Sequence, residues 1–210
     1  MDGLWAFLLL AVVLSLTPGP DDFLVLGSAL RGGPRLGAAT ALGAATGALM
    51  WGAATAVGLA AVVSRSAAAY DTIRFAGAAY LVVLGALPLV WRAIGRPERV
   101  PAMSPGDGPS RSGVGPAFAA GLMSDLLNPK IGLFYVAVVP QFIPAGQSPL
   151  AYSLLLCAID VAVALVWLLG LTWVAHAAVR WLQRPDVVRW SQRCFSVCLV
   201  AIGGSVAFGM

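Results

Sequence analysis

Five ionisable residues lie inside or beside long apolar stretches of the 210-residue sequence: Asp21, Asp22, Asp125, Lys130 and Asp160. An ionised side chain costs about 2.5–3.5 kcal/mol at the centre of a membrane helix, so five of them left in lipid would cost on the order of 15 kcal/mol. We therefore expect them to face the interior of a helix bundle. There the carboxylates suit an ammonium group or a proton, and the lysine suits a carboxylate.

Two short motifs, TPGPDD and NPK, interrupt the apolar stretches next to these charges. Threonine and asparagine are favoured N-cap residues, and proline is favoured at the first helical position. We therefore expect a helix to stop and restart at Thr17 and again at Asn128, about a dozen residues into each stretch. At 1.5 Å per residue this is roughly 18–20 Å deep, near the middle of a hydrocarbon core about 30 Å thick.

The prolines at these breaks leave main-chain carbonyls without their helical donors, as Pro18 does for Leu14. Such groups are tolerated at membrane depth only beside protein or a water-filled cavity. The restarted helices direct their positive ends at the midplane, which favours a bound carboxylate. We expect a binding or coupling site formed by both motifs and the nearby acids: Thr17, Pro18, Gly19, Pro20, Asp21, Asp22, Asp125, Asn128, Pro129, Lys130 and Asp160.

The composition places these elements in a membrane. The chain is 60% hydrophobic and 10% charged, with a mean hydropathy of +0.87, whereas a soluble domain carries about 25% charged residues. We predict an all-α integral membrane protein, since a spanning helix needs about 20 mostly apolar residues. Six transmembrane helices are expected, at about 4–28, 37–63, 72–91, 115–140, 150–178 and 190–209.

A linker rich in proline, glycine and serine divides the six spans into three plus three. Residues 1–92 are expected to form a first three-helix repeat, 93–114 a cytoplasmic linker, and 115–210 a second three-helix repeat. An odd number of spans inverts one half relative to the other, with helices 1 and 4 both broken near the midplane. Two inverted repeats with interrupted helices indicate a secondary transporter.

The arginines predict which loops face the cytoplasm. Only Arg65 and Arg74 follow the second expected span, and no basic residue lies between 140 and 150. Under the positive-inside rule the arginine-rich loops are cytoplasmic, so both termini are predicted to be extracytoplasmic. Ten arginines follow the first, third and fifth expected spans: Arg31, Arg35, Arg92, Arg96, Arg99, Arg111, Arg180, Arg184, Arg189 and Arg193.

The sequence leaves alternative roles open for the buried charges. Asp21 and Asp22 occupy the first turn of a restarted helix, where a carboxylate simply complements the helix dipole. Lys130 is placed either to pair with Asp125 or Asp21, or to bind a substrate carboxylate while an aspartate binds the substrate ammonium group. An aspartate that takes up a proton would couple transport to the proton gradient. Asp160 is either functional or a hydrogen-bond partner for a neighbouring helix.

Small residues in the second expected span predict close helix packing. Gly43 and Gly47 form a GxxxG pair, which suits a contact inside one subunit or, alternatively, a homodimer contact. Cys157, Cys194 and Cys198 lie in apolar spans with no further cysteine or histidine to complete a metal site. Neither a metal nor another cofactor is expected.

At these motifs the sequence resembles the LysE/RhtB family of bacterial amino-acid exporters. The resemblance covers nearly the whole chain and is carried by TPGPDDFLVL, ALRGGPRLGAATALG, GAAYLVVLG and GLMSDLLNPKIGLFYVAVVPQF. It implies a multi-pass protein of the bacterial cytoplasmic (inner) membrane that exports amino acids or related metabolites against protons. The implied partners are a small-molecule amino-acid substrate, protons and membrane lipid, without nucleic acid.

The resemblance also implies which residues form the site. The family's first break matches 17–20 with the polar residue Asp21, and its second break matches 128–130, with 140–142 closing the span. Many members are similar but carry asparagine where Asp21 and Asp125 stand. The two extra carboxylates predict either a preference for cationic substrates or altered proton coupling.

Other function classes fit less well. Membrane reductases with inverted three-helix halves need cysteines at the breaks, and both motifs contain none, so no enzyme is expected. The alternative is an exporter of metal ions or other cations, because four buried aspartates offer oxygen ligands to hard cations.

Overall fold

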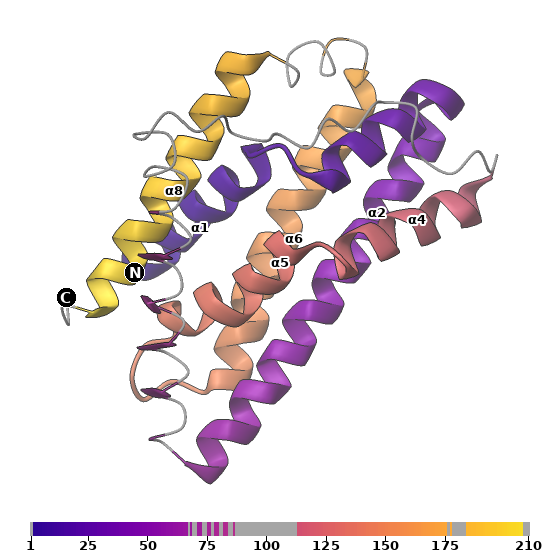
Figure 1. The fold of residues 1–210 in the computed structure, drawn as a ribbon. Coiled ribbons are helices and arrows are strands. Elements are labelled where there is room, and N and C mark those ends of the chain that lie inside the picture. The colour runs from indigo at the N-terminus through magenta and orange to yellow at the C-terminus, as the bar shows by residue number, and fades with distance from the viewer. Residues whose placement is uncertain are drawn as a thin grey trace.

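A computed structural model describes residues 2–66, 113–175 and 184–207, together with scattered positions between 68 and 86 and residue 177. Every regular element in the described ranges is helical, as predicted (Figure 1). In chain order the elements are α1 (Asp2–Leu16), α2 (Pro20–Arg65), α4 (Val114–Leu126), α5 (Pro129–Leu133), the π-helix η1 (Phe134–Val138), the 3₁₀ helix η2 (Val139–Phe142), α6 (Pro149–Trp173) and α8 (Pro185–Ala207).

Two described helical segments are long and apolar enough to cross a membrane, Pro20–Val62 and Pro149–Trp173. A third candidate is the pair Val114–Leu126 and Pro129–Phe142, which is bent by 49° at its break. The predicted third span at 72–91 lies largely outside the described residues, as does nearly all of the predicted linker. The described chain is therefore a helical membrane protein, in which the full set of six spans stays a prediction.

The predicted loop between the first two spans is a kink instead. α2 runs for 46 residues, and only Gly32 and Gly33 leave helical geometry. Gly33 has a φ of 74°, which glycine adopts without a steric penalty, and Pro34 follows it directly. A straight helix of this length would be about 69 Å long, more than twice a hydrocarbon core of about 30 Å. The kink therefore divides α2 into a short arm that leads from the first break and a long arm that packs on α4 and α6.

Glycines allow α2 and α4 to cross with their backbones in contact. A Cβ atom added to Gly43 would lie 2.0 Å from the carbonyl oxygen of Phe118, and one added to Gly121 would lie 2.0 Å from that of Thr40. The GxxxG pair predicted from the sequence is thus used inside one chain, since Gly47 also lies directly against the Asp125 side chain.

Two clusters of buried side chains support the centre of the fold. One joins α1, η1 and α6, with Phe7, Phe134 and Leu156 among its members. The other joins the short arm of α2 to α6 through residues such as Leu26 and Leu168. In Figure 1, α1 lies beside α8, and α6 lies between this pair and the long arm of α2. Through these clusters α6 supports both the end of α1 and the short arm of α2, the two helices that flank the first break.

Candidate functional site

The first break differs by two residues from its prediction. α1 ends at Leu16, but α2 begins at Pro20 with Gly19, not Thr17, as its N-cap. The hydroxyl of Thr17 donates back to the carbonyl of Val13 at 2.7 Å, and Thr17 does not cap α2. The Asp22 carboxylate supplies the cap instead, because its Oδ2 accepts the main-chain N–H of Gly19 at 2.7 Å. The second proline of the motif, not the first, takes the favoured first helical position.

The second break is confirmed where it was predicted. α4 ends at Leu126, and Asn128 caps α5 with its side-chain oxygen, which accepts the main-chain N–H of Lys130 at 3.0 Å. Pro129 follows at the first helical position, where its missing N–H costs nothing.

Hydrogen bonds join the two breaks. The Asn128 amide donates to Oδ2 of Asp21 at 2.7 Å, and the hydroxyl of Ser124 donates to Oδ1 of the same carboxylate. The Lys130 ammonium donates to the carbonyls of Leu14 and Thr17, each at 2.7 Å. Leu14 is the residue whose carbonyl loses its helical donor to Pro18. A lysine from one break thus satisfies main-chain acceptors at the other.

The remaining acids reach the same place from α2, α4 and α6. Asp22 Oδ1 accepts a hydrogen bond from the Trp167 indole at 2.7 Å. Asp160 Oδ2 accepts one from the Tyr135 hydroxyl at 2.9 Å, and both residues are buried. Asp125 is only 3% exposed, and its Oδ1 has no hydrogen-bond partner among the described residues.

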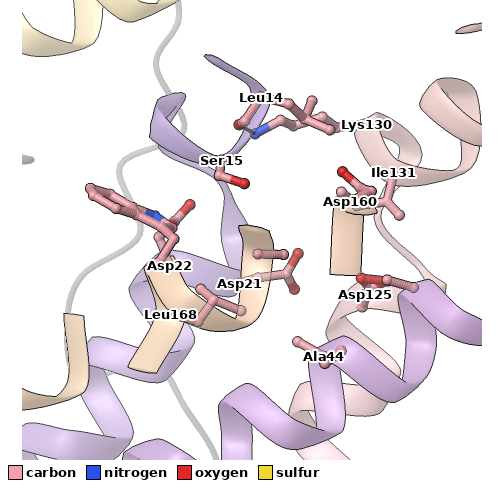
Figure 2. A pocket seen from close by; sticks show the side chains of 14 residues that line it. Leu14, Ser15, Asp21, Asp22, Ala44, Asp125, Lys130, Ile131, Asp160 and Leu168 are labelled. Atoms are coloured by element: carbon pink, nitrogen blue, oxygen red, sulfur yellow. Dashed lines mark hydrogen bonds between the residues drawn. The ribbon is translucent and has the colours of Figure 1, made fainter. Parts of the chain in front are cut away.

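All five predicted charges line one cavity of about 50 Å³ (Figure 2). A water molecule needs roughly 10–15 Å³ of such space, so the cavity has room for only a few waters in this conformation. Thr17 and Asn128 support the site through hydrogen bonds and do not line the cavity. The lining residues are Leu14, Ser15, Asp21, Asp22, Ala44, Ala45, Ala48, Asp125, Lys130, Ile131, Asp160, Ala164, Trp167 and Leu168.

Four polar residues of the site were not predicted from the sequence: Ser15, Ser124, Tyr135 and Trp167. Buried tyrosine and tryptophan side chains usually bond their polar atoms to a partner, which was the available signal for two of them. The π-helix η1 places Tyr135 against Asp160, and π-helical turns are frequent at functional sites. No group of three or more potential metal ligands occurs in the part of the chain that the structure describes.

Comparisons with known proteins add a family to this geometry. Residues 12–209 match the sequence model of the LysE type translocators. The uncharacterized membrane protein YrhP of Bacillus subtilis is 30% identical over 97% of both chains. The homoserine/homoserine lactone efflux protein of Salmonella typhi is 30% identical over 97% of this chain and 95% of its own. A leucine efflux protein of an Enterobacter species is 29% identical over 73% and 70%. No solved structure matches.

Proposed function

Because the chain belongs to the LysE type translocator family, we propose that it exports amino acids or closely related metabolites by proton antiport. Membership makes the protein a membrane translocator rather than an enzyme. Relatives named as homoserine and leucine efflux proteins support an amino-acid substrate. The observation that carries the proposal is the small cavity at two joined helix breaks, lined by four carboxylates and one lysine.

The chemistry of the cavity suits an amino acid. Carboxylates bind an ammonium group through charge-assisted hydrogen bonds, which are about twice as strong as neutral ones. The alanines, Ile131 and Leu168 offer an apolar surface to a side chain. Since the cavity has room for only a few water molecules, it must widen to hold an amino acid, in conformations in which the helices at the breaks have moved apart.

The excess of acids supports proton coupling. Four carboxylates and one ammonium group leave a formal excess of negative charge in a cavity removed from water. An unneutralised charge of this kind is costly to bury. Protons that enter from outside, in exchange for a substrate that leaves, would neutralise the excess in each cycle.

The topology we propose for this mechanism is the one predicted from the sequence. Six spans form two inverted repeats, 1–92 and 115–210, joined by a cytoplasmic linker at 93–114, and both termini face outside the cytoplasmic membrane. The break between α1 and α2 and the break between α4 and α5 occur in the opening span of each half, which supports the repeat. The arginine distribution supports the orientation.

Transport into inside-out vesicles tests the proposal. Vesicles that contain the protein should accumulate labelled homoserine or leucine when a proton gradient is imposed, and a protonophore should abolish the accumulation. Lys130→Met, which keeps length and removes charge, should lower uptake at least about tenfold, whereas Asp71→Asn on an exposed position should not. Accumulation of divalent cations without amino acids would replace the proposal with the cation exporter.

A further inference from the structure

We propose that Asp125 binds the ammonium group of the substrate and that the site does not require a substrate carboxylate. Open-chain amino-acid esters would then be carried as well as free amino acids, beyond the lactone that the name of the Salmonella typhi relative already includes. The inference rests on the proposed export function and names the chemical group that the cavity recognises.

Asp125 is distinguished from the other cavity acids by a buried carboxylate oxygen that accepts no hydrogen bond from the described residues. Both oxygens of Asp21 and both oxygens of Asp22 accept hydrogen bonds, and Asp160 accepts one from Tyr135. Asp125 lines the cavity, is 3% exposed, and has an oxygen, Oδ1, with no partner among the described residues. Figure 2 shows its carboxylate beside the cavity, near that of Asp160. A buried acceptor without a partner is unfavourable, and an ammonium donor from the substrate would relieve it.

Gly47 positions this carboxylate. A Cβ atom added to Gly47 would lie 2.8 Å from Cβ of Asp125 and 3.1 Å from both its Cγ and its Oδ1. The first of these distances is too short for real atoms, so Asp125 would have to move. Because Gly47 has no side chain, the Asp125 carboxylate can occupy its observed position against α2. Gly47 is therefore a positioning residue for the ammonium site.

Lys130 is already engaged by the protein. It is the single basic residue among those that line the cavity in the described part of the chain. Its ammonium group donates to two main-chain carbonyls at the end of α1, where the negative end of the helix dipole also favours a cation. Its charge therefore stabilises the first break, and the substrate carboxylate is left without a dedicated partner.

The cavity is unsuited to a metal ion in place of the ammonium group. A hard divalent cation needs six or more oxygen ligands at short distance, whereas no three potential ligands are grouped for it in the described ranges. One partnerless carboxylate beside alanines and Leu168 suits a single ammonium group next to a small uncharged side chain.

Counterflow in proteoliposomes tests the inference, because exchange requires binding without net proton movement. Labelled homoserine and labelled leucine are offered first. Whichever is carried is then competed with its ester (homoserine lactone or leucine methyl ester) and with its N-acetyl derivative. The ester, which keeps the ammonium group, should compete within about threefold of the parent. The N-acetyl derivative, which keeps only the carboxylate, should be at least about tenfold weaker.

Variants separate binding from coupling and from folding. Asp125→Asn should raise the KM for the parent and its ester together by about tenfold, with a smaller change in maximal counterflow rate. Gly47→Ala, which retains the carboxylate but displaces it, should shift KM in the same direction. Asp71→Asn and Gly58→Ala are matched controls, since Asp71 is exposed and nothing lies within 4 Å of a Cβ atom at Gly58. Both controls should leave KM unchanged.

Three results would overturn the inference while the export function stands. They are competition by the N-acetyl derivative equal to that of the parent, failure of the ester to compete, or a KM in Asp125→Asn within twofold of the unmodified protein. Loss of proton-driven accumulation with an unchanged counterflow KM would give Asp125 a coupling role instead. If the unmodified protein carries neither amino acid, the proposed substrate class itself fails.

Discussion

Replacement of Asn128 by alanine should destabilise the protein by more than the loss of a helix cap. Its side-chain oxygen caps α5 through the Lys130 N–H, which contributes about 1 kcal/mol. Its amide donates to the Asp21 carboxylate across the breaks, and a hydrogen bond to a charged group contributes about 1.5–3 kcal/mol. Asn128 is 4% exposed, so water does not readily replace either bond. The free energy of unfolding should therefore fall by about 2.5–4 kcal/mol.

Reversible unfolding in mixed detergent micelles measures this loss. Ser148→Ala is the matched control, because Ser148 caps α6 in an exposed loop and makes no contact across the breaks that would add to the loss. It should cost only about 1 kcal/mol. A double-mutant cycle of Asn128→Ala with Asp21→Asn should give a coupling energy of about 1.5 kcal/mol or more. Additivity within about 0.5 kcal/mol would refute the argument that this bond joins the two halves of the site.

Four further changes test other parts of the structure. Gly43→Ala should destabilise the protein by about 1–3 kcal/mol in the same unfolding assay, because its Cβ atom would collide with the backbone of α4. Gly58→Ala should be neutral or stabilising, by up to about 1 kcal/mol, since its surroundings are open. Tyr135→Phe removes the donor to Asp160 and should cost about 1–3 kcal/mol, a loss that a second change of Asp160 to asparagine should largely restore. Ala145 lies in the exposed turn before α6, which the proposed orientation places outside the cytoplasm. In intact cells Ala145→Cys should therefore react with a membrane-impermeant maleimide. Protection from the reagent would reverse the proposed orientation.

The sequence predicts the second break more accurately than the first. At Asn128 a single N-cap residue precedes a single proline, so only one helix start is available. The TPGP motif offers two prolines and therefore two possible starts. The side chain of Thr17 bonds back to α1, and Asp22 provides a cap that is available only when the helix begins at Pro20. Local propensity identifies the break, whereas competition between two capping arrangements decides its position.

The gathering of the five charges was predictable from polarity, but their bonding partners were not. Burial of five charges in a small apolar protein requires that they gather, and all five line one cavity. The sequence offered an aspartate or a substrate carboxylate as partner for Lys130, yet its ammonium group donates to main-chain carbonyls of α1. The position of Pro18 predicts that the Leu14 carbonyl lacks its usual donor, but nothing in the sequence indicates which side chain supplies another. Tyr135 reaches Asp160 through a π-helical turn, which changes the register of the side chains that follow it.

The bonds of Lys130 hold the two breaks together. Pro18 removes the usual helical donor to the Leu14 carbonyl, which instead accepts the main-chain N–H of Thr17 at 3.2 Å and the Lys130 ammonium group at 2.7 Å. If the halves separate, this carbonyl and that of Thr17 lose a charged donor at a depth where lipid offers none. Loss of these charged hydrogen bonds therefore opposes opening toward a dry, empty cavity. Water or a substrate ammonium group in the cavity would offset the loss by donating to the same carbonyls.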